Sequence, residues 1–330
     1  MLRAVILFLS FVSHMSWANA NPTLCVFDPV GSNGPIYAQM QEYRTQALNW
    51  GVSFNIKAYT SESVAVGDFK AGICEAVLIT GTQARQFNRF TGTVEAVGGL
   101  NSYNELQELI TLLASPNAAR YQKEGRYEIA GIIPGGSVFV FVRDKAIDSI
   151  EAASGKKVAT LDYDMASRKV VDYIGATIVP STVATFAPRF NNGDVDIAYA
   201  PAIAYAPFEM YRGLGSTGGI YRFAFAQMNF QIVLQQQNFA DDFAQKSREY
   251  IAQQFNKSMN YITLAESEIP SGYWLDLEDQ QAIDYLAMLA RIRTELADEG
   301  VYDPQMIKLM KNLRCRANPM HAECSFDLDL

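Results

Sequence analysis

The order of strand and helix patterns constrains the fold of this chain more than any other feature. Six short apolar or alternating runs predict strands, and helical patterns separate them within each group. They fall into two groups, residues 23–27, 53–60 and 75–80, and residues 156–162, 176–181 and 195–201. Each group predicts a β-α-β-α-β unit, and such units form mainly parallel sheets flanked by helices. The chain is therefore predicted to be an α/β protein with two lobes.

Further patterns complete this outline. Residues 103–122 predict a helix, residues 127–134 and 137–146 predict two strands separated by a turn at Pro134, Gly135 and Gly136, and residues 222–237 predict a strand. Helices are expected at residues 241–255, 277–296 and 303–314. We expect lobe I at residues 21–142, lobe II at 143–225, a return to lobe I at 226–262, and helices packed across both lobes at 263–330.

The first twenty residues predict export. Arg3 precedes an apolar run, and Ala18, Asn19 and Ala20 offer a cleavage site, so residues 1–20 are predicted to be a signal peptide. No later run reaches the roughly 18 apolar residues of a membrane span, which predicts no direct membrane insertion after signal removal. Without Arg3, 26 basic residues face 35 acidic ones, a net charge of about −9. This balance argues against nucleic acid and anionic lipid as partners.

Four cysteines follow the predicted signal peptide, and an even number in an oxidising compartment predicts two disulfides. Cys25 lies in the first predicted strand and Cys74 precedes the third, so neighbouring parallel strands would bring the two together. Cys315 and Cys324 are predicted to pair with each other.

Catalytic chemistry is poorly supported. His14 falls in the predicted signal peptide, and His321 lies in a short terminal loop. Triad hydrolases and most zinc sites need a histidine on a packed scaffold. The turn at residues 30–35 matches neither the dinucleotide fingerprint nor the phosphate-binding loop of nucleotide hydrolases. We therefore predict no enzyme, no cofactor and no metal.

Polar residues near predicted strand ends are the candidate ligand contacts, because ligands of such sheets bind at the carboxyl ends of the strands. The candidates are Ser32, Asn33, Thr80, Gln83, Arg85, Asp162, Tyr163, Asp164, Tyr199 and Asn229. Each has a structural alternative. Ser32 and Asn33 could belong to a plain turn before a helix, Asp164 could cap a helix, and the tyrosines could pack in a core. Arg85 suits an oxyanion or an internal salt bridge equally well.

Residues 155–201 resemble the TRAP-type (DctP-like) periplasmic solute-binding proteins. In that family a strand leaves the hinge, a helix leads to Gly-Ala, a Val-Pro follows, and a second helix ends in Gly-x-x-Asp. The matching points are Gly175-Ala176, Val179-Pro180 and Gly193 to Asp196. The resemblance implies a type II-like two-lobed periplasmic-binding-protein fold, with a small-molecule solute and inner-membrane transporter subunits as partners.

One position departs from that pattern. TRAP receptors usually place an arginine inside the first strand of lobe II to hold a substrate carboxylate, and Ala159 stands there. Residues 68–99 also resemble a little-characterised receptor-like group, some once labelled efflux components linked to aminoglycoside resistance. We expect a receptor that captures a small polar solute in an interlobe cleft by hinge motion. The alternatives left open are an interaction or efflux-accessory protein on the same fold and a histidine-free enzyme that uses carboxylates.

Overall fold

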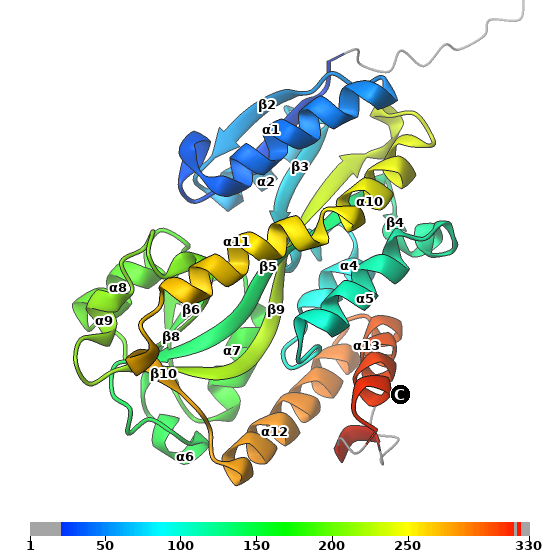
Figure 1. Ribbon diagram of the computed structural model, residues 1–330. Coiled ribbons are helices and arrows are strands. Elements are labelled where there is room, and N and C mark those ends of the chain that lie inside the picture. Colours follow the sequence, from blue (N-terminus) through cyan, green and yellow to red (C-terminus); the bar gives the residue numbers. More distant parts are fainter. Residues whose placement is uncertain (1–20, 320–321, 325–330) are drawn as a thin grey trace, which may run out of the picture.

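A single mixed sheet runs through the computed structural model, which describes residues 21–319 and 322–324 (Figure 1). Its strands are β1 (Thr23–Phe27), β2 (Asn55–Tyr59), β3 (Ala76–Thr80), β4 (Lys123–Glu124), β5 (Tyr127–Val142), β6 (Lys157–Leu161), β7 (Thr177–Ser181), β8 (Ile197–Pro201), β9 (Gly219–Gln235) and β10 (Trp274–Leu275). The main path has the order β2-β1-β3-β9-β5-β8-β6-β7. The predicted signal peptide and His321 lie outside the described residues.

The two ends of this path form two halves. The first half is the parallel set β2, β1 and β3, and the second half is the set β8, β6 and β7, in which β6 is parallel to both neighbours. Between them lie the long strands β9 and β5, each antiparallel to its neighbours on the main path. The two predicted β-α-β-α-β groups thus correspond to the two halves, and the α/β prediction is confirmed.

Helices cover the first half. They are α1 (Pro35–Ala47), α2 (Glu62–Lys70), the short α3 (Gly81–Ala84) and α4 (Arg89–Gly92), and α5 (Tyr103–Ala114). The short helices α3 and α4 among them were not predicted. The predicted helix over residues 103–122 is too long, because α5 ends at Ala114 and a 3-10 helix follows from Pro116. Proline disfavours helical backbone at the residue before it, and Ser115 is extended.

The second half carries α6 (Ile150–Ala153), α7 (Met165–Tyr173), α8 (Phe186–Asn192) and α9 (Tyr211–Leu214). Asp164 caps α7 by accepting a hydrogen bond from the backbone N–H of Ser167 at 3.1 Å, so the N-cap alternative for Asp164 is correct. Gly193 ends α8 with a φ of +84°, a backbone conformation that glycine adopts without a steric cost.

Strand β5 overturns one prediction. The expected turn at Pro134, Gly135 and Gly136 does not exist, because β5 continues from Tyr127 to Val142 with a register shift between Pro134 and Gly136. Bulges tolerate a missing N–H and a positive φ, and Gly136 has a φ of +106°. Val138–Val142 of β5 pairs with β8, whereas β9 pairs with β3 through its last residues. The predicted lobe boundaries stay a prediction.

The C-terminal helices link the two halves. They are α10 (Phe243–Gln253), α11 (Phe255–Glu268), α12 (Asp279–Asp298) and α13 (Pro304–Ala317); α11 was not predicted. Helix α11 lies along β5, contacts the turn at Ala202–Ala204, and accepts a hydrogen bond from Gln39 of α1 at Ser258. Helix α12 contacts α7, and α13 contacts α5. In Figure 1 these helices run beside both halves. Within residues 21–319 and 322–324, no helix has the length and hydropathy of a membrane span.

Both predicted disulfides are present. Cys25 and Cys74, both fully buried, are joined with their Cα atoms 5.9 Å apart, at the place where β1 runs beside β3. Cys315 and Cys324 are joined with a Cα distance of 5.6 Å and close the end of α13. The larger apolar core belongs to the first half and the C-terminal helices, and two smaller cores lie on the second half.

Candidate binding cleft

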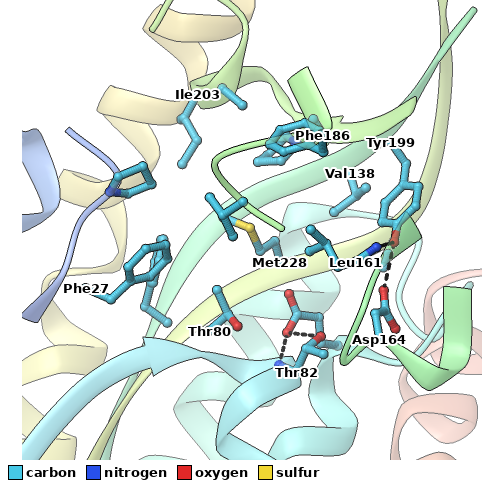
Figure 2. Close-up of a pocket in the computed structure, with 18 of the residues that line it drawn as sticks. Phe27, Thr80, Thr82, Val138, Leu161, Asp164, Phe186, Tyr199, Ile203 and Met228 are labelled. Atoms are coloured by element: carbon cyan, nitrogen blue, oxygen red, sulfur yellow. Dashed lines mark hydrogen bonds between the residues drawn. The ribbon is translucent and has the colours of Figure 1, made fainter. Parts of the chain in front are cut away.

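A cavity of about 160 Å³ lies between the two halves (Figure 2). Its lining comes from β1, β3 and the segments after them in the first half, from β6, α7 and β8 in the second half, and from the central strands β5 and β9. Figure 2 shows Phe27, Ile203 and Phe186 around one side of the cavity, with Thr82, Asp164 and Tyr199 along the opposite edge. The cavity thus has an apolar body and a polar end, as small-molecule sites commonly do.

Arg85 stands at the polar end, one turn beyond the end of β3. Its Nε and Nη2 atoms both donate hydrogen bonds to the carbonyl oxygen of Gly92, each at 3.2 Å. The guanidinium also lies over the ring of Tyr302, 4.8 Å from the ring centroid. A cation held against an aromatic face and a carbonyl has little rotational freedom, so Arg85 presents a fixed positive charge to the cleft.

Glu95 is a buried carboxyl group whose ionisation is favoured by the positive charge of Arg85. Its Oε2 atom accepts hydrogen bonds from the backbone N–H and the hydroxyl of Thr82, the latter at 3.0 Å. A Cβ atom at Gly81 would lie 2.7 Å from Oε2, so glycine there permits the close approach. Burial raises the pKa of Glu95 to about 8, although the charge of Arg85 and the hydrogen bonds from Thr82 act in the opposite direction.

Asp164 and Tyr199 form a second polar pair on the other half. The Tyr199 hydroxyl lies 3.3 Å from Asp164 Oδ2 and accepts a hydrogen bond from the backbone N–H of Leu161 at 3.2 Å (Figure 2). Burial, and next the charge of Asp164, raise the pKa of Tyr199 well above its usual value. Tyr199 therefore stays a neutral hydroxyl at physiological pH, held in place by the β6–α7 turn.

One hydrogen bond crosses from half to half beside the cavity. The hydroxyl of Tyr163, in the β6–α7 turn, donates to Oε2 of Glu62 at 2.8 Å. Glu62 begins α2 and is buried, and its Oε1 atom accepts from the backbone N–H of Thr80 at 2.6 Å. Burial raises the pKa of Glu62. These two hydrogen bonds join the end of β3 to the turn after β6, and Thr80 and Tyr163 both line the cavity.

The segment that carries Glu95 is held by the C-terminal helices. Arg293 of α12 is fully buried and donates to the carbonyl oxygens of Val97 and Gly98 at 3.1 and 2.8 Å. Arg314 of α13 donates to the carbonyl of Gly99, and both arginines pair with Glu323. The C-terminal helices thus fix one wall of the cleft from behind.

A family model for the solute-binding proteins AdeT 1/2 matches residues 49–329. The chain belongs to the AdeT1/2 solute-binding protein family. It is 38% identical to the probable solute-binding protein AdeT1 of Acinetobacter baumannii over 302 residues, which cover 92% of this chain and 99% of AdeT1. It is 25% identical to AdeT2 of the same organism over 233 residues, 71% of this chain and 98% of AdeT2.

Solved structures share the fold at low sequence identity. A TRAP periplasmic solute-binding protein from Desulfovibrio salexigens, with bound orotic acid, superposes with a TM-score of 0.74 and 12% identity and covers 90% of this chain and 99% of its own. One from Sulfitobacter, with bound β-D-galacturonate, gives a TM-score of 0.71 and 12% identity over 89% and 99%. The predicted resemblance to TRAP receptors is therefore confirmed at the level of fold. The family is one of binding proteins and not of enzymes.

Half of the predicted ligand residues line the cleft of this AdeT1/2 family member. Those that do are Thr80, Arg85, Tyr163, Asp164 and Tyr199. Ala159, where the resemblance predicts an arginine in related receptors, also lines the cavity with a small apolar side chain.

The turn at residues 30–35 does not bring its predicted ligand residues to the cavity. Asp28 accepts hydrogen bonds from the backbone N–H groups of Val30 and Tyr37, both at 2.9 Å, and so occupies the start of α1. Ser32 and Asn33 are exposed and do not line the cavity. The N–H groups at this helix start, which could hold an anion, thus hold a carboxylate of the same chain.

The other three predicted residues lie near the cleft without lining it. Gln83 is buried in α3, and Asp162 is exposed. Asn229 is fully buried on β9, where its amide donates to the carbonyl of Gln227 and its Oδ1 accepts from Gln231 at 2.9 Å.

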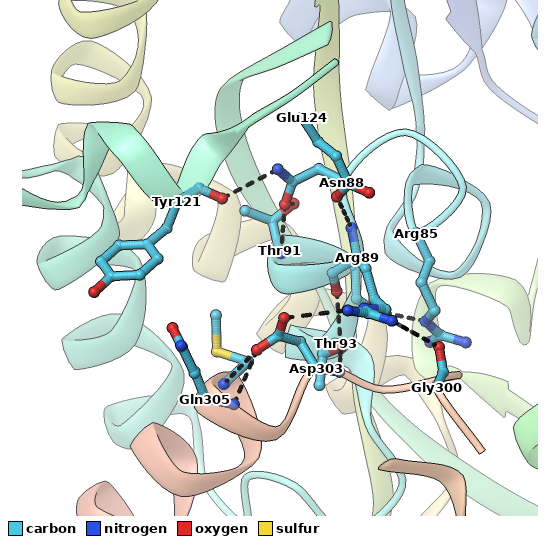
Figure 3. A network of polar contacts seen from close by, with 12 residues as sticks. Arg85, Asn88, Arg89, Thr91, Thr93, Tyr121, Glu124, Gly300, Asp303 and Gln305 are labelled. Atoms are coloured by element: carbon cyan, nitrogen blue, oxygen red, sulfur yellow. Dashed lines mark hydrogen bonds and ion pairs between the residues drawn. The ribbon is translucent and has the colours of Figure 1, made fainter. Parts of the chain in front are cut away.

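Asn88 and Arg89 hold in place the segment that runs from β3 to Glu95 (Figure 3). Asn88 caps α4 by accepting from the backbone N–H of Thr91 at 2.8 Å and donates to the carbonyl of Tyr121. Arg89 donates to the carbonyl of Gly300 at 3.3 Å and lies 4.0 Å from a carboxylate oxygen of Asp303. These residues tie the wall of the cleft to the start of α13.

Sequence reasoning missed Glu95 and Glu62. A signal for Glu95 was available, since it is the lone charged residue in the apolar run Val94 to Leu100. A single acid in such a run indicates a buried carboxyl group with a specific partner. Glu62, at a helix start, gave no comparable signal.

Proposed function

We propose that this chain is a periplasmic receptor that captures a small polar solute between the two halves of the fold and presents it to a membrane transporter. The observation that carries the proposal is the cavity itself, because its lining is drawn from both halves and combines an apolar body with a buried polar end. A site built from two separate units closes when the units move together around a solute. The central strands β5 and β9, which run between the two halves, are the natural hinge.

The relatives support this class of ligand. Orotic acid and β-D-galacturonate, named for two structural neighbours, are small polar molecules of a size that an interlobe cavity accepts. For this chain we propose Thr80, Arg85, Tyr163, Asp164 and Tyr199 as solute contacts, together with Thr82 and Glu95. Ser32, Asn33, Gln83, Asp162 and Asn229 are not included, because they do not line the cavity.

Thermal unfolding tests the proposal. The protein lacking residues 1–20 would be denatured and refolded to remove bound solute, then screened against organic acids, amino acids, sugar acids, amines and polyamines. A ligand at 100 times its dissociation constant adds about 2.7 kcal/mol of stability. We expect at least one class to raise the unfolding midpoint of the wild type but not of Ala200→Trp, which fills the cavity. The control Ala38→Trp, on the exposed face of α1, should respond like the wild type.

A second function has one observation in its favour. Most of the cavity lining is apolar, which suits a receptor fold that has lost its solute and serves as an interaction or efflux-accessory protein. No response from correctly refolded protein across the whole panel would favour this function over the receptor.

A further inference from the structure

The charges at the polar end of the cleft are unbalanced. Glu95 and Asp164 line it, and Arg85 is the one basic residue among the described residues that do so. Asp28 also lines the cavity, and its carboxylate accepts from N–H groups at the start of α1, as that of Asp164 does at the start of α7. Three acidic residues and one basic residue therefore line the cavity within the described part of the chain.

Arg85 is already engaged by other groups of the chain. Two of its nitrogen atoms donate to the carbonyl of Gly92, and its guanidinium plane is stacked on Tyr302. A bidentate hold on a carboxylate needs two adjacent N–H groups free. An acid bound through Nε and Nη2 would have to break those contacts, which leaves only the Nη1 and Nη2 end of the guanidinium for a carboxylate.

Glu95, in contrast, has an oxygen atom available. Both recorded hydrogen bonds go to Oε2, and no group in the described part of the chain donates to Oε1. Glu95 lines the cavity, although its side chain is largely buried. A carboxyl oxygen without a donor on the wall of a largely apolar cavity is a position where a ligand with positive charge gains most.

The remainder of the cavity suits an apolar cation. Phe27, Phe186, Tyr199 and Phe225 contribute aromatic rings to the lining, and aromatic faces attract ammonium groups. Within the described residues, no three His, Cys, Asp or Glu side chains gather as a metal site. We propose that the cleft selects an organic cation, an ammonium group on an apolar body, with the charge between Glu95 and Asp164. This inference rests on the proposed receptor function.

The binding should depend on pH. Glu95 faces Thr82 and Arg85 of the first half and the charge of Asp164 from the second half, and burial raises its pKa to about 8. A cation binds the ionised carboxylate, so its affinity should rise as the pH rises through 8. Because the apparent affinity follows the ionised fraction, the gain between pH 7 and pH 9 approaches about tenfold.

A matched pair of probes tests the inference. Benzyltrimethylammonium and phenylmethanesulfonate share a benzyl body and a tetrahedral head, and their charges are opposite and independent of pH. Isothermal titration calorimetry of the refolded protein would measure both at pH 7 and pH 9, in the wild type, in Glu95→Gln and in Glu108→Gln. Glu108 lies on α5 with an exposed side chain, so its substitution removes one negative charge far from the cleft.

We expect the ammonium probe to bind the wild type and Glu108→Gln alike, and more tightly at pH 9 than at pH 7. At pH 9 it should bind Glu95→Gln about tenfold more weakly than the wild type. Tighter binding of the sulfonate would overturn the inference and leave the receptor function standing. Unchanged binding of the ammonium probe to Glu95→Gln would also overturn it. Silence of both probes overturns it as well, and the receptor function falls with it only if the wider panel of solutes is silent too.

Discussion

The hydrogen bond from Tyr163 to Glu62 allows a sharp test of how the two halves are held together. It is 2.8 Å long, and the acceptor carboxyl group is 2% exposed. Tyr163→Phe removes the donor and keeps the ring. Glu62 retains its bond from the backbone of Thr80, so the change isolates the contact between the halves.

The magnitude follows from the surroundings. A buried hydrogen bond contributes about 1 kcal/mol when neutral and up to about 3 kcal/mol when its acceptor is charged. Tyr163→Phe should therefore lower the free energy of unfolding by about 1–3 kcal/mol. Tyr211→Phe is the matched control, because its hydroxyl also donates to a glutamate, Glu209, but on an exposed surface within the second half. The control should change stability by less than about 0.5 kcal/mol.

Urea unfolding of a double-mutant cycle measures the effect. The four proteins are the wild type, Tyr163→Phe, Glu62→Ala and the double variant. If the two residues act through their shared bond, Tyr163→Phe should cost little once Glu62 is alanine. Additive effects of the two substitutions, or a cost no larger than that of Tyr211→Phe, would refute the reasoning.

Three further predictions concern single groups. Burial raises the pKa of Glu95 from 4.5 to about 8, so the folded state holds this proton more tightly than the unfolded chain, and stability should fall as the pH rises from about 4.5 to 8. That fall is up to about 5 kcal/mol, and Glu95→Gln should abolish it in urea unfolding measured across this pH range. A difference in stability between Glu95→Gln and the wild type that does not change with pH would contradict the raised pKa of Glu95. Glu323→Ala removes the carboxylate that pairs with buried Arg293 and Arg314, and we expect it to lower the free energy of unfolding by about 3–5 kcal/mol. The control Glu299→Gln, at an exposed pair with Lys169, should lower it by less than about 1 kcal/mol. Gly34→Ala places a Cβ atom 2.1 Å from both carboxylate oxygens of Asp28, and it should lower the free energy of unfolding by at least about 1 kcal/mol. The control Gly67→Ala, in open space on α2, should raise it by about 0.5–1 kcal/mol. Equal effects in thermal unfolding would show that Asp28 does not hold the start of α1.

The order of elements and the disulfides could be predicted because they depend on local patterns. Apolar runs bounded by glycine gave the strands of both halves, and Cys25 and Cys74 followed from their places beside β1 and β3. The predicted turn at Pro134 to Gly136 was wrong because proline and glycine usually break a strand, whereas pairing with β9 before and after the bulge keeps this one continuous. Helix α11 was missed because it buries few residues, namely Phe255, Ser258 and Ile262.

A residue of the site could be predicted only where its position at the end of a strand is enough to bring it to the cleft. Thr80 ends β3 and Tyr163 follows the end of β6, and parallel strands bring such positions to one edge of the sheet. Ser32 and Asn33 could not be assigned this way, since Asp28 and not a solute occupies the start of α1. Glu95 depends on α12 and α13, whose arginines hold its segment from about 200 residues away in the sequence.

Hydrogen exchange tests the central claim, that a solute binds between the halves, most directly. Exchange of the refolded protein would be followed by mass spectrometry with and without the compound that raises its unfolding midpoint most. The account predicts slower exchange in both residues 80–85 and residues 161–167, because the two segments face the same cavity from opposite halves. Protection confined to one half, or to a surface away from the cavity, would contradict it.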